Sequence, residues 1–445
     1  MLYPLYPKRL RDHARESAKQ TRAGFIGWLL VATATLFPAR VWSQAHPADT
    51  VLARLTAEAI AANPSLEASR ARARAATARV RPAGALPDPM LSAGVMNLTL
   101  PRFAFRESDF TEVDVELTQE FPWPGTLGAR TRVAEAQARE VLADASVRRR
   151  DIVITTAELY YRLRYLVTVR ATLVRQRSLL ATAVEIATNR YATALAPQSD
   201  PLQARVALAR LDAEDADLAE QQAAVGAQLK AIRNVHAPER LTLELISTEV
   251  IQPILHGQGS GLRAGAESLA SHPRLAARRA ALEAAERTVR VERLGGRPDF
   301  GITTRYGARP LGDDFFSAFI GVRLPLWAGR KQGRLAEAAR ADAAAARAAL
   351  DDEAAGLAAE LESTLARIAA GERRLTLLYQ QVLPSAQETV NAVLRSYRVG
   401  SAPFLNVLAA EDSLYRAELE ALMVAAEHFT HLVMLDQLVS QEDAS

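Results

Sequence analysis

Apolar residues recur at every seventh position along four long stretches of the chain, which predicts long helices that pack side by side. A sustained seven-residue period keeps an apolar seam facing a neighbouring helix, as in a coiled coil. The first helix is predicted from about residue 129 to 193, and about 65 helical residues span roughly 100 Å. Pro384 should interrupt the equivalent helix of the second half, because proline lacks a backbone N–H donor. The repeating positions are Ile152, Leu159, Leu166, Leu173 and Leu180, flanked by Val153, Tyr160, Val167 and Val174, then Leu211, Leu218, Val225 and Ile232, then Leu361, Ile368, Leu375 and Val382, and finally Leu408, Tyr415, Leu422 and Phe429.

Four shorter stretches alternate between apolar and polar residues, which predicts β-strands. They cover residues 89–100, 110–121, 299–308 and 315–326. Each is about 10 to 12 residues long, as a tilted strand needs to cross a bilayer, although soluble hairpins alternate in the same way. The second stretch carries acids on one side and hydrocarbon on the other, at Glu112, Asp114 and Glu116 and at Val113, Val115 and Leu117.

The two halves of the chain resemble each other in sequence, which predicts a duplicated architecture. Four pairs of short matches occur in the same order and at nearly one offset, beginning with Asn63-Pro64 and His272-Pro273 and ending with the segments that follow Tyr191 and Tyr397. We predict a first repeat over 46–240 and a second over 271–440, each with a helix, two strands, a long helix, a break and a helix. Residues 241–270, which include the glycine-rich stretch 257–261, should form the linker, and 441–445 a tail.

The N-terminus has the pattern of a secretory signal peptide. A basic segment precedes an apolar run over 23–37, and small residues follow at Ser43 and Ala45. We therefore predict a signal peptide over residues 1–45, with cleavage after Ala45. The leader carries seven Lys or Arg residues and two acids, whereas the whole chain has a formal net charge of +3, so the mature part is about −2. This balance argues against a nucleic-acid partner, which requires a basic surface.

If the exported protein enters a membrane, its four predicted strands require several copies of the chain to assemble. No later apolar run is long enough to cross a bilayer as a helix, so a closed barrel would be needed. Four strands cannot close a barrel, since the smallest bacterial barrels have eight. Copies of the chain must then complete it together, with the carboxylates toward a wet lumen and the valines and leucine toward lipid. Phe121, Trp123 and Trp327 stand at strand ends, where aromatic girdles occur.

Enzyme and metal-site chemistry have little support in the sequence. Cysteine is absent, which excludes disulfides, thiolate metal sites and a cysteine-linked lipid anchor. No nucleophile-elbow, zinc-protease or phosphate-loop motif is present, and no cofactor is expected. His428 and His431 share one helix face, but two ligands are too few for a structural metal site.

The repeats resemble the TolC-type outer-membrane efflux proteins over roughly residues 50 to 440. Tyr397-x-x-Gly400-Ser401-Ala402 leading into Leu405-Asn406-Val407-Leu408 is similar to the family's helix–helix turn, and Phe121-Pro122-Trp123-Pro124-Gly125 resembles its heavy-metal branch, the outer components of cobalt–zinc–cadmium or copper–silver exporters. The resemblance implies a mainly α fold with two β-hairpins, and a homotrimer with a twelve-stranded outer-membrane barrel and a twelve-helix tunnel in the periplasm. It further implies a passive duct that works with a periplasmic adaptor and an inner-membrane pump of the resistance-nodulation-division type.

The resemblance also implies roles for the two helix–helix turns. The residues that would contact the adaptor are Ala194, Leu195, Ala196 and Pro197 and, in the second repeat, Gly400, Ser401, Ala402 and Pro403. Ordinary helix-hairpin turns are the alternative. Relatives narrow the entrance with acidic rings, whereas the matching positions here are Asn406 and Ala409. Asp200, the counterpart of Asn406, is the remaining acidic gate candidate; alternatively, it is an N-cap.

Glu112, Asp114 and Glu116 would form a negative belt in the lumen, which would favour cations. The alternative is that Arg305 and Arg323 neutralise them. Three functional hypotheses therefore follow: a duct for heavy-metal cations, a duct for drugs or a secreted polypeptide, and a periplasmic coiled-coil scaffold without a pore.

Overall fold

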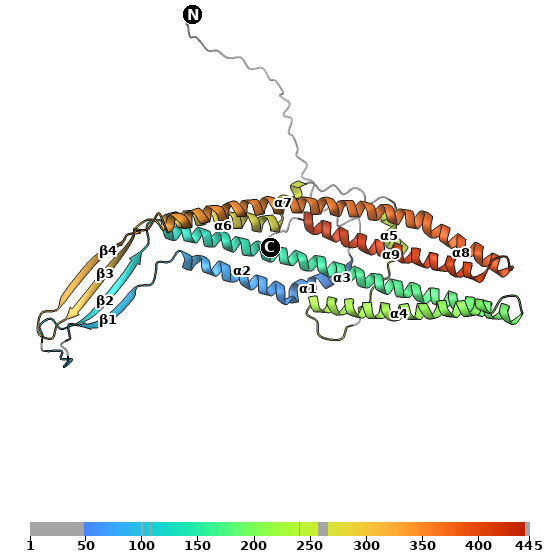
Figure 1. Ribbon diagram of the computed structural model, residues 1–445, viewed down its shortest axis with the longest axis horizontal. Helices are drawn as coiled ribbons and strands as arrows, with labels where there is room; N and C mark the ends of the chain where they lie inside the picture. Colours follow the sequence, from blue (N-terminus) through green and yellow to red (C-terminus); the bar gives the residue numbers. More distant parts are fainter. Residues whose placement is uncertain (1–48, 99–100, 107, 240, 257–265, 441–445) are drawn as a thin grey trace, which may run out of the picture. The chain divides into compact units, whose positions relative to one another are not determined.

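The computed structural model describes residues 49–98, 101–106, 108–239, 241–256 and 266–440. The predicted signal peptide, the glycine-rich stretch 257–261 and the tail 441–445 lie outside these residues. The first half contains α1 (Thr50–Ala62), α2 (Pro64–Ala83), β1 (Met90–Met96), β2 (Glu112–Phe121), α3 (Thr126–Ala192) and α4 (Ser199–Ile232). The second contains α6 (Pro273–Leu294), β3 (Asp299–Ala308), β4 (Phe315–Arg323), α7 (Gln332–Leu377), α8 (Leu383–Arg398) and α9 (Phe404–Val439). In each half a helix leads into two strands, and the strands lead into long helices (Figure 1).

Helix α3 is the central packing element of the described chain. It has 67 residues and contacts α2, α4, α6 and α9, so it joins the two halves. The predicted seam is buried at Ile152, Leu166 and Leu173. The flanking series is less buried than predicted, because Val174 is 63% exposed. A ring stack between Tyr161 and Phe429, with centroids 5.5 Å apart, fixes α3 against α9.

A π-helical turn at Leu378–Val382 separates α7 from α8, and Pro384 stands in the first turn of α8. The predicted interruption is therefore confirmed. The π turn holds one extra residue, so the buried series moves by one position, from Leu375 to Val390 and Tyr397. Val382, which the seven-residue period had placed in the seam, is 43% exposed for this reason.

The matched Asn-Pro and His-Pro pairs both begin helices. The Asn63 side chain accepts hydrogen bonds from the backbone N–H groups of Ser65 and Leu66 at the start of α2. The His272 ring accepts one from Arg274 N, at 3.2 Å, at the start of α6. In each case proline occupies the first helical turn, where its missing N–H costs nothing.

The four strands form one antiparallel sheet in the order β1-β2-β3-β4. In its register Glu116 lies opposite Ser92 on one side and Arg305 on the other. Strand β4 ends at Arg323, before the predicted end at 326, because Pro325 has no N–H to donate to a ladder.

The segment 241–270, predicted as a linker, includes helical structure in its described residues, 241–256 and 266–270. It contains α5 (Thr248–Leu255) and the start of a 3₁₀ helix (η2, Ala266–Ser271). Its backbone is tied to α3, since Ile246 N donates to Thr168 Oγ1 at 3.0 Å and Arg164 Nε donates to Glu244 O at 2.8 Å. Over the described parts of the chain, no helix has both the length and the apolar character of a membrane span.

Candidate functional site

The sheet has one apolar face, and that face is exposed. The register brings Val115, Tyr306 and Phe316 to one side, with exposed fractions of 43%, 49% and 69%. This face also carries large apolar side chains that are each more than a third exposed, at Leu91, Val95, Val113, Leu117, Phe300, Ile302, Ile320 and Val322. A soluble sheet buries such a face against a core. An exposed apolar surface of this extent is typical of an interaction with lipid or with another protein.

The opposite face is mainly polar, although Met90, Met96 and Phe319 are also exposed on it. This face carries the predicted belt. Glu112 and Asp114 are buried, at 6% and 9% exposed, and Glu116 is half-buried. Arg305 pairs with Glu112 and, at 3.3 Å from Nε to Oδ2, with Asp114. Arg309 Nε lies 3.8 Å from Glu112 Oε2. The belt is thus partly neutralised, as the alternative prediction held for Arg305.

The second predicted cation, Arg323, meets a different carboxylate. It forms an ion pair with Glu120, near the end of β2 that leads into α3. The second cation beside the belt is instead Arg309, which the sequence analysis had not singled out.

The two helix–helix turns lie side by side and share one cation. Arg190, near the end of α3, donates from Nη1 to Tyr397 O at 2.7 Å and to Arg398 O at 2.9 Å, and from Nη2 to Leu195 O at 3.1 Å. Its guanidinium group also stands 4.7 Å from the centre of the Tyr397 ring. One side chain therefore joins the turn at 193–198 to the turn at 399–403.

The residues predicted to contact the adaptor form the tips of the two helix pairs. They are largely exposed, and two of them have a left-handed backbone conformation. Ala194 has φ +57° and Gly400 φ +78°. Gly400 adopts this conformation without the steric cost that a Cβ would add. Beneath the tips, Ala187, Ala204 and Phe404 belong to one buried cluster that includes residues of both halves.

Asp200 is buried, at 7% exposed, just after the turn at 193–198. Tyr397 Oη donates to Asp200 Oδ2 at 3.3 Å. Burial and the nearby Asp200 carboxylate raise the pKa of Tyr397, so the phenol keeps its proton. The N-cap interpretation of Asp200 is wrong, because the N-cap of α4 is Gln198 and Asp200 stands in the first turn. Asn406, its counterpart, is exposed in the first turn of α9.

The chain matches a known family over most of its length. Residues 55–234 and 265–441 match the family described as outer membrane efflux protein. The chain belongs to this family. No curated protein matches it.

Solved outer-membrane channels share the fold of this efflux protein. CusC is 16% identical, with a TM-score of 0.79 and coverage of 92% of this chain and 96% of that one. OprN is 17% identical, with a TM-score of 0.74 and coverage of 88% and 90%. VceC of Vibrio cholerae is 20% identical, with a TM-score of 0.73 and coverage of 88% and 96%.

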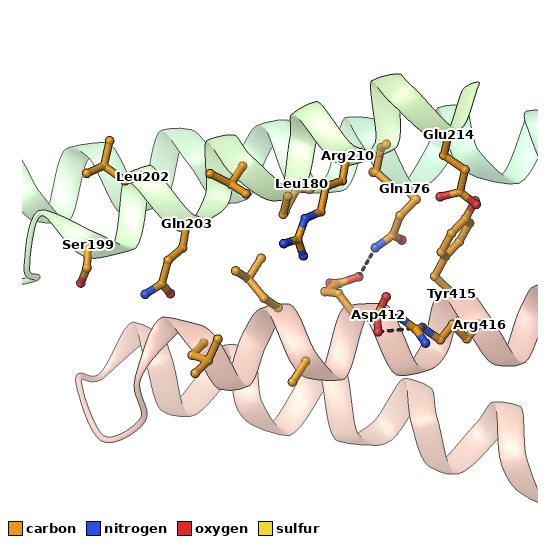
Figure 2. Close-up of a pocket in the computed structure, with 17 residues that line it drawn as sticks. Gln176, Leu180, Ser199, Leu202, Gln203, Arg210, Glu214, Asp412, Tyr415 and Arg416 are labelled. Atoms are coloured by element: carbon orange, nitrogen blue, oxygen red, sulfur yellow. Dashed lines mark hydrogen bonds and ion pairs between the residues drawn. The ribbon is translucent and has the colours of Figure 1, made fainter. Parts of the chain in front are cut away.

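A groove of about 750 Å³ opens between α4 and α9 of this efflux protein, adjoining the tips (Figure 2). Two hydrogen bonds cross it: Gln176 Nε2 donates to Glu411 Oε2 at 3.1 Å, and Tyr415 Oη donates to Glu214 Oε1 at 3.0 Å. Burial and the Glu214 carboxylate raise the pKa of Tyr415, which keeps this phenol a donor.

Several of these contacts have no signal in the sequence. Tyr415 was predicted only as a seam residue, and Arg190 has serine, Ser396, at the matching position of the other repeat. His428 packs against α7, where a Cβ added to Gly371 would lie 3.3 Å from its Nδ1. Within the described residues, no group of three or more His, Asp or Glu side chains could hold a metal ion.

Proposed function

We propose that the protein is the outer-membrane exit duct of a tripartite efflux system and that three copies form the duct. The observation that carries this proposal is the sheet, whose apolar face is exposed while its polar face is ion-paired. Lipid satisfies the apolar face, and a water-filled lumen satisfies the polar one.

The sheet edges support assembly by shared strands. Within the described residues β1 pairs with β2 and β4 pairs with β3, so each outer strand has one edge without a partner. Unpaired backbone groups in hydrocarbon cost several kcal/mol each. Pairing β1 of one copy with β4 of the next removes both edges, and three copies give a barrel of about twelve strands, within the range of bacterial barrels.

The helix tips are the proposed contact with a periplasmic adaptor, which in turn reaches an inner-membrane pump of the resistance-nodulation-division type. Their exposure and small side chains support this role, since a helical partner can approach closely. The Asp200–Tyr397 hydrogen bond ties the two turns together, and we propose it as part of the gate at this end, near Asn406. The duct itself performs no bond chemistry.

Heavy-metal cations are the proposed cargo. The support is the Phe121–Gly125 sequence, which resembles the heavy-metal branch and forms the junction from β2 to α3 in the structure. There Trp123 N donates to Asp299 Oδ1 at 2.9 Å and its ring stacks on Phe300. Drugs or a secreted polypeptide are the alternative cargoes, and a pore-free scaffold is the alternative of another class.

Planar-bilayer recording of the purified full-length protein tests the duct. A duct gives discrete, long-lived conductance steps, whereas a scaffold gives none. Heat-denatured protein at the same detergent concentration is the control.

Resistance of a gene-deletion strain tests the cargo. We expect sensitivity to zinc, cadmium, cobalt or copper, restored by the wild-type gene but not by an empty vector. Sensitivity confined to dyes and detergents would replace the metal proposal with the drug alternative.

A further inference from the structure

We propose that Arg305 and Arg309 cancel most of the negative charge of the lumen belt. The part of the pore that the sheet lines then does not strongly favour cations. Glu116 then carries the cation preference that remains. This inference rests on the proposed function and names the residues that set the charge selectivity of the duct.

Arg305 reaches past its direct cross-strand neighbour to the end of the sheet remote from the helices. The register places Arg305 opposite Glu116, yet its guanidinium group pairs with Glu112 and Asp114. All three paired side chains are largely covered: counted over the side-chain atoms alone, 19% of Arg305, 8% of Glu112 and 13% of Asp114 is exposed. Glu116 accepts a hydrogen bond from Thr118 Oγ1 at 3.3 Å. No ion pair of Glu116 is found among the described residues.

An aromatic ring holds the arginines in this arrangement. The guanidinium group of Arg309 lies 4.7 Å from the centre of the Phe315 ring, and that of Arg305 lies 5.9 Å from it. Both distances are within the range of a cation–π contact. The ring has room because Gly307 lies opposite Phe315, where a Cβ would approach the ring to 2.4 Å.

A second glycine makes room for the carboxylate. Asp114 lies between Gly94 and Gly307 in the register, and a Cβ on Gly94 would stand 3.3 Å from Asp114 Oδ1. The two glycines and the Phe315 ring thus shape a fixed site for the ion pairs, unlike an exposed pair in which long side chains move freely.

Two guanidinium groups therefore stand against the three carboxylates of the belt in each copy. A cation a few ångströms from a carboxylate cancels its charge at longer range, and salt screens what remains over about 8 to 10 Å. A lumen ring that selects cations needs carboxylates whose charge is not cancelled. In this belt only Glu116 meets that condition.

Reversal potentials across planar bilayers under a tenfold KCl gradient test the inference. The variant Arg305→Gln with Arg309→Gln uncovers Glu112 and Asp114, and we expect its K⁺/Cl⁻ permeability ratio to rise at least about twofold. The variant Glu120→Gln with Arg323→Gln removes one charge of each sign from an exposed ion pair outside the belt. It is the matched control, expected to match wild type. Glu116→Gln should lower the wild-type ratio.

If the variant Arg305→Gln with Arg309→Gln keeps the wild-type reversal potential, this inference is overturned, but the proposal that the protein is a duct is not. If that variant fails to assemble, Glu112→Gln with Asp114→Asn decides, because it leaves the arginines unopposed and should move the reversal potential toward anions. An unchanged potential there would overturn the inference as well. Wild-type protein that forms no channels would instead contradict the proposed function, and this inference with it.

Discussion

At the scale of single residues, His272 and Asn63 perform the same capping task with different chemistry. Burial, followed by the positive charges of Arg150 and Arg274, lowers the pKa of His272 from 6.5 to about 4. The neutral ring can accept the hydrogen bond from Arg274 N, whereas a ring protonated on both nitrogens cannot. The cap of α6 is therefore sensitive to acid and the cap of α2 is not.

His272→Asn should make the protein less sensitive to acid. Well above pH 6.5 the His272 ring is neutral in both the folded and the unfolded protein, so it adds no pH dependence to the free energy of unfolding. Between pH 6.5 and about 4 the unfolded chain binds a proton that the folded chain refuses, so stability falls with pH, by about 3 kcal/mol from this group. Thermal unfolding in detergent at pH 7.5 and 4.5 measures this loss. An equal drop in melting temperature for wild type and variant would contradict the assignment.

Tyr397→Phe should loosen the contact between the two helix turns. The variant removes the phenol that donates to Asp200 and keeps the ring over which Arg190 lies. One such hydrogen bond contributes about 1 kcal/mol. We expect a higher mean conductance or open probability in planar bilayers. Tyr191→Phe is the matched control, because Tyr191 is the counterpart of Tyr397 in the first repeat and is 45% exposed. Equal effects of the two substitutions would exclude this bond from the gate.

At the scale of elements, the periodicities located the helices and strands because burial repeats with the backbone geometry. The starts of β3 and β4 follow from that pattern, whereas the break at Pro384 follows from the missing backbone donor of proline. The charge pairs did not follow, because a slip of one residue in the register exchanges the two faces of a strand. Arg309 could be paired with Glu112 only once the register placed Gly307 beside Asp114.

The π turn at Leu378–Val382 gives a prediction at this scale. Deleting Gln380 removes its extra residue, so α7 and α8 can join in the same phase and keep Leu375 and Val390 buried. Deleting Ala355, an exposed residue within α7, instead rotates all later positions by about 100°. We expect the Gln380 deletion to assemble with nearly the wild-type melting temperature and the Ala355 deletion to fail. Similar losses in both would contradict the bulge.

The absence of cysteine permits a direct test of the two sheet faces. Val115→Cys and Glu116→Cys place a fluorophore on adjacent residues that face opposite ways. In vesicles, brominated lipid should quench the label at position 115, and aqueous iodide should quench the label at position 116. The reverse result would mean that the register is shifted by one residue, and quenching of both labels by iodide alone would place the sheet outside the bilayer.

At the scale of the whole molecule, one copy leaves two sheet edges and one apolar face without partners in the described residues. The central claim is that neighbouring copies supply these partners. A pair of cysteines, Ser92→Cys on β1 and Ser317→Cys on β4, tests the claim because both stand on the polar face of an edge strand. Within one copy three strand spacings separate them, or about 14 Å, which is too far for a disulfide.

The measurement is oxidation of the double variant in outer-membrane vesicles, followed by a denaturing gel without reductant. Each single variant is the control and should run as a monomer. The shared barrel predicts cross-linked dimers and trimers and no larger species, with all bands returning to monomer after reduction. A double variant that stays monomeric, or a ladder that continues beyond three copies, would contradict the closed trimer.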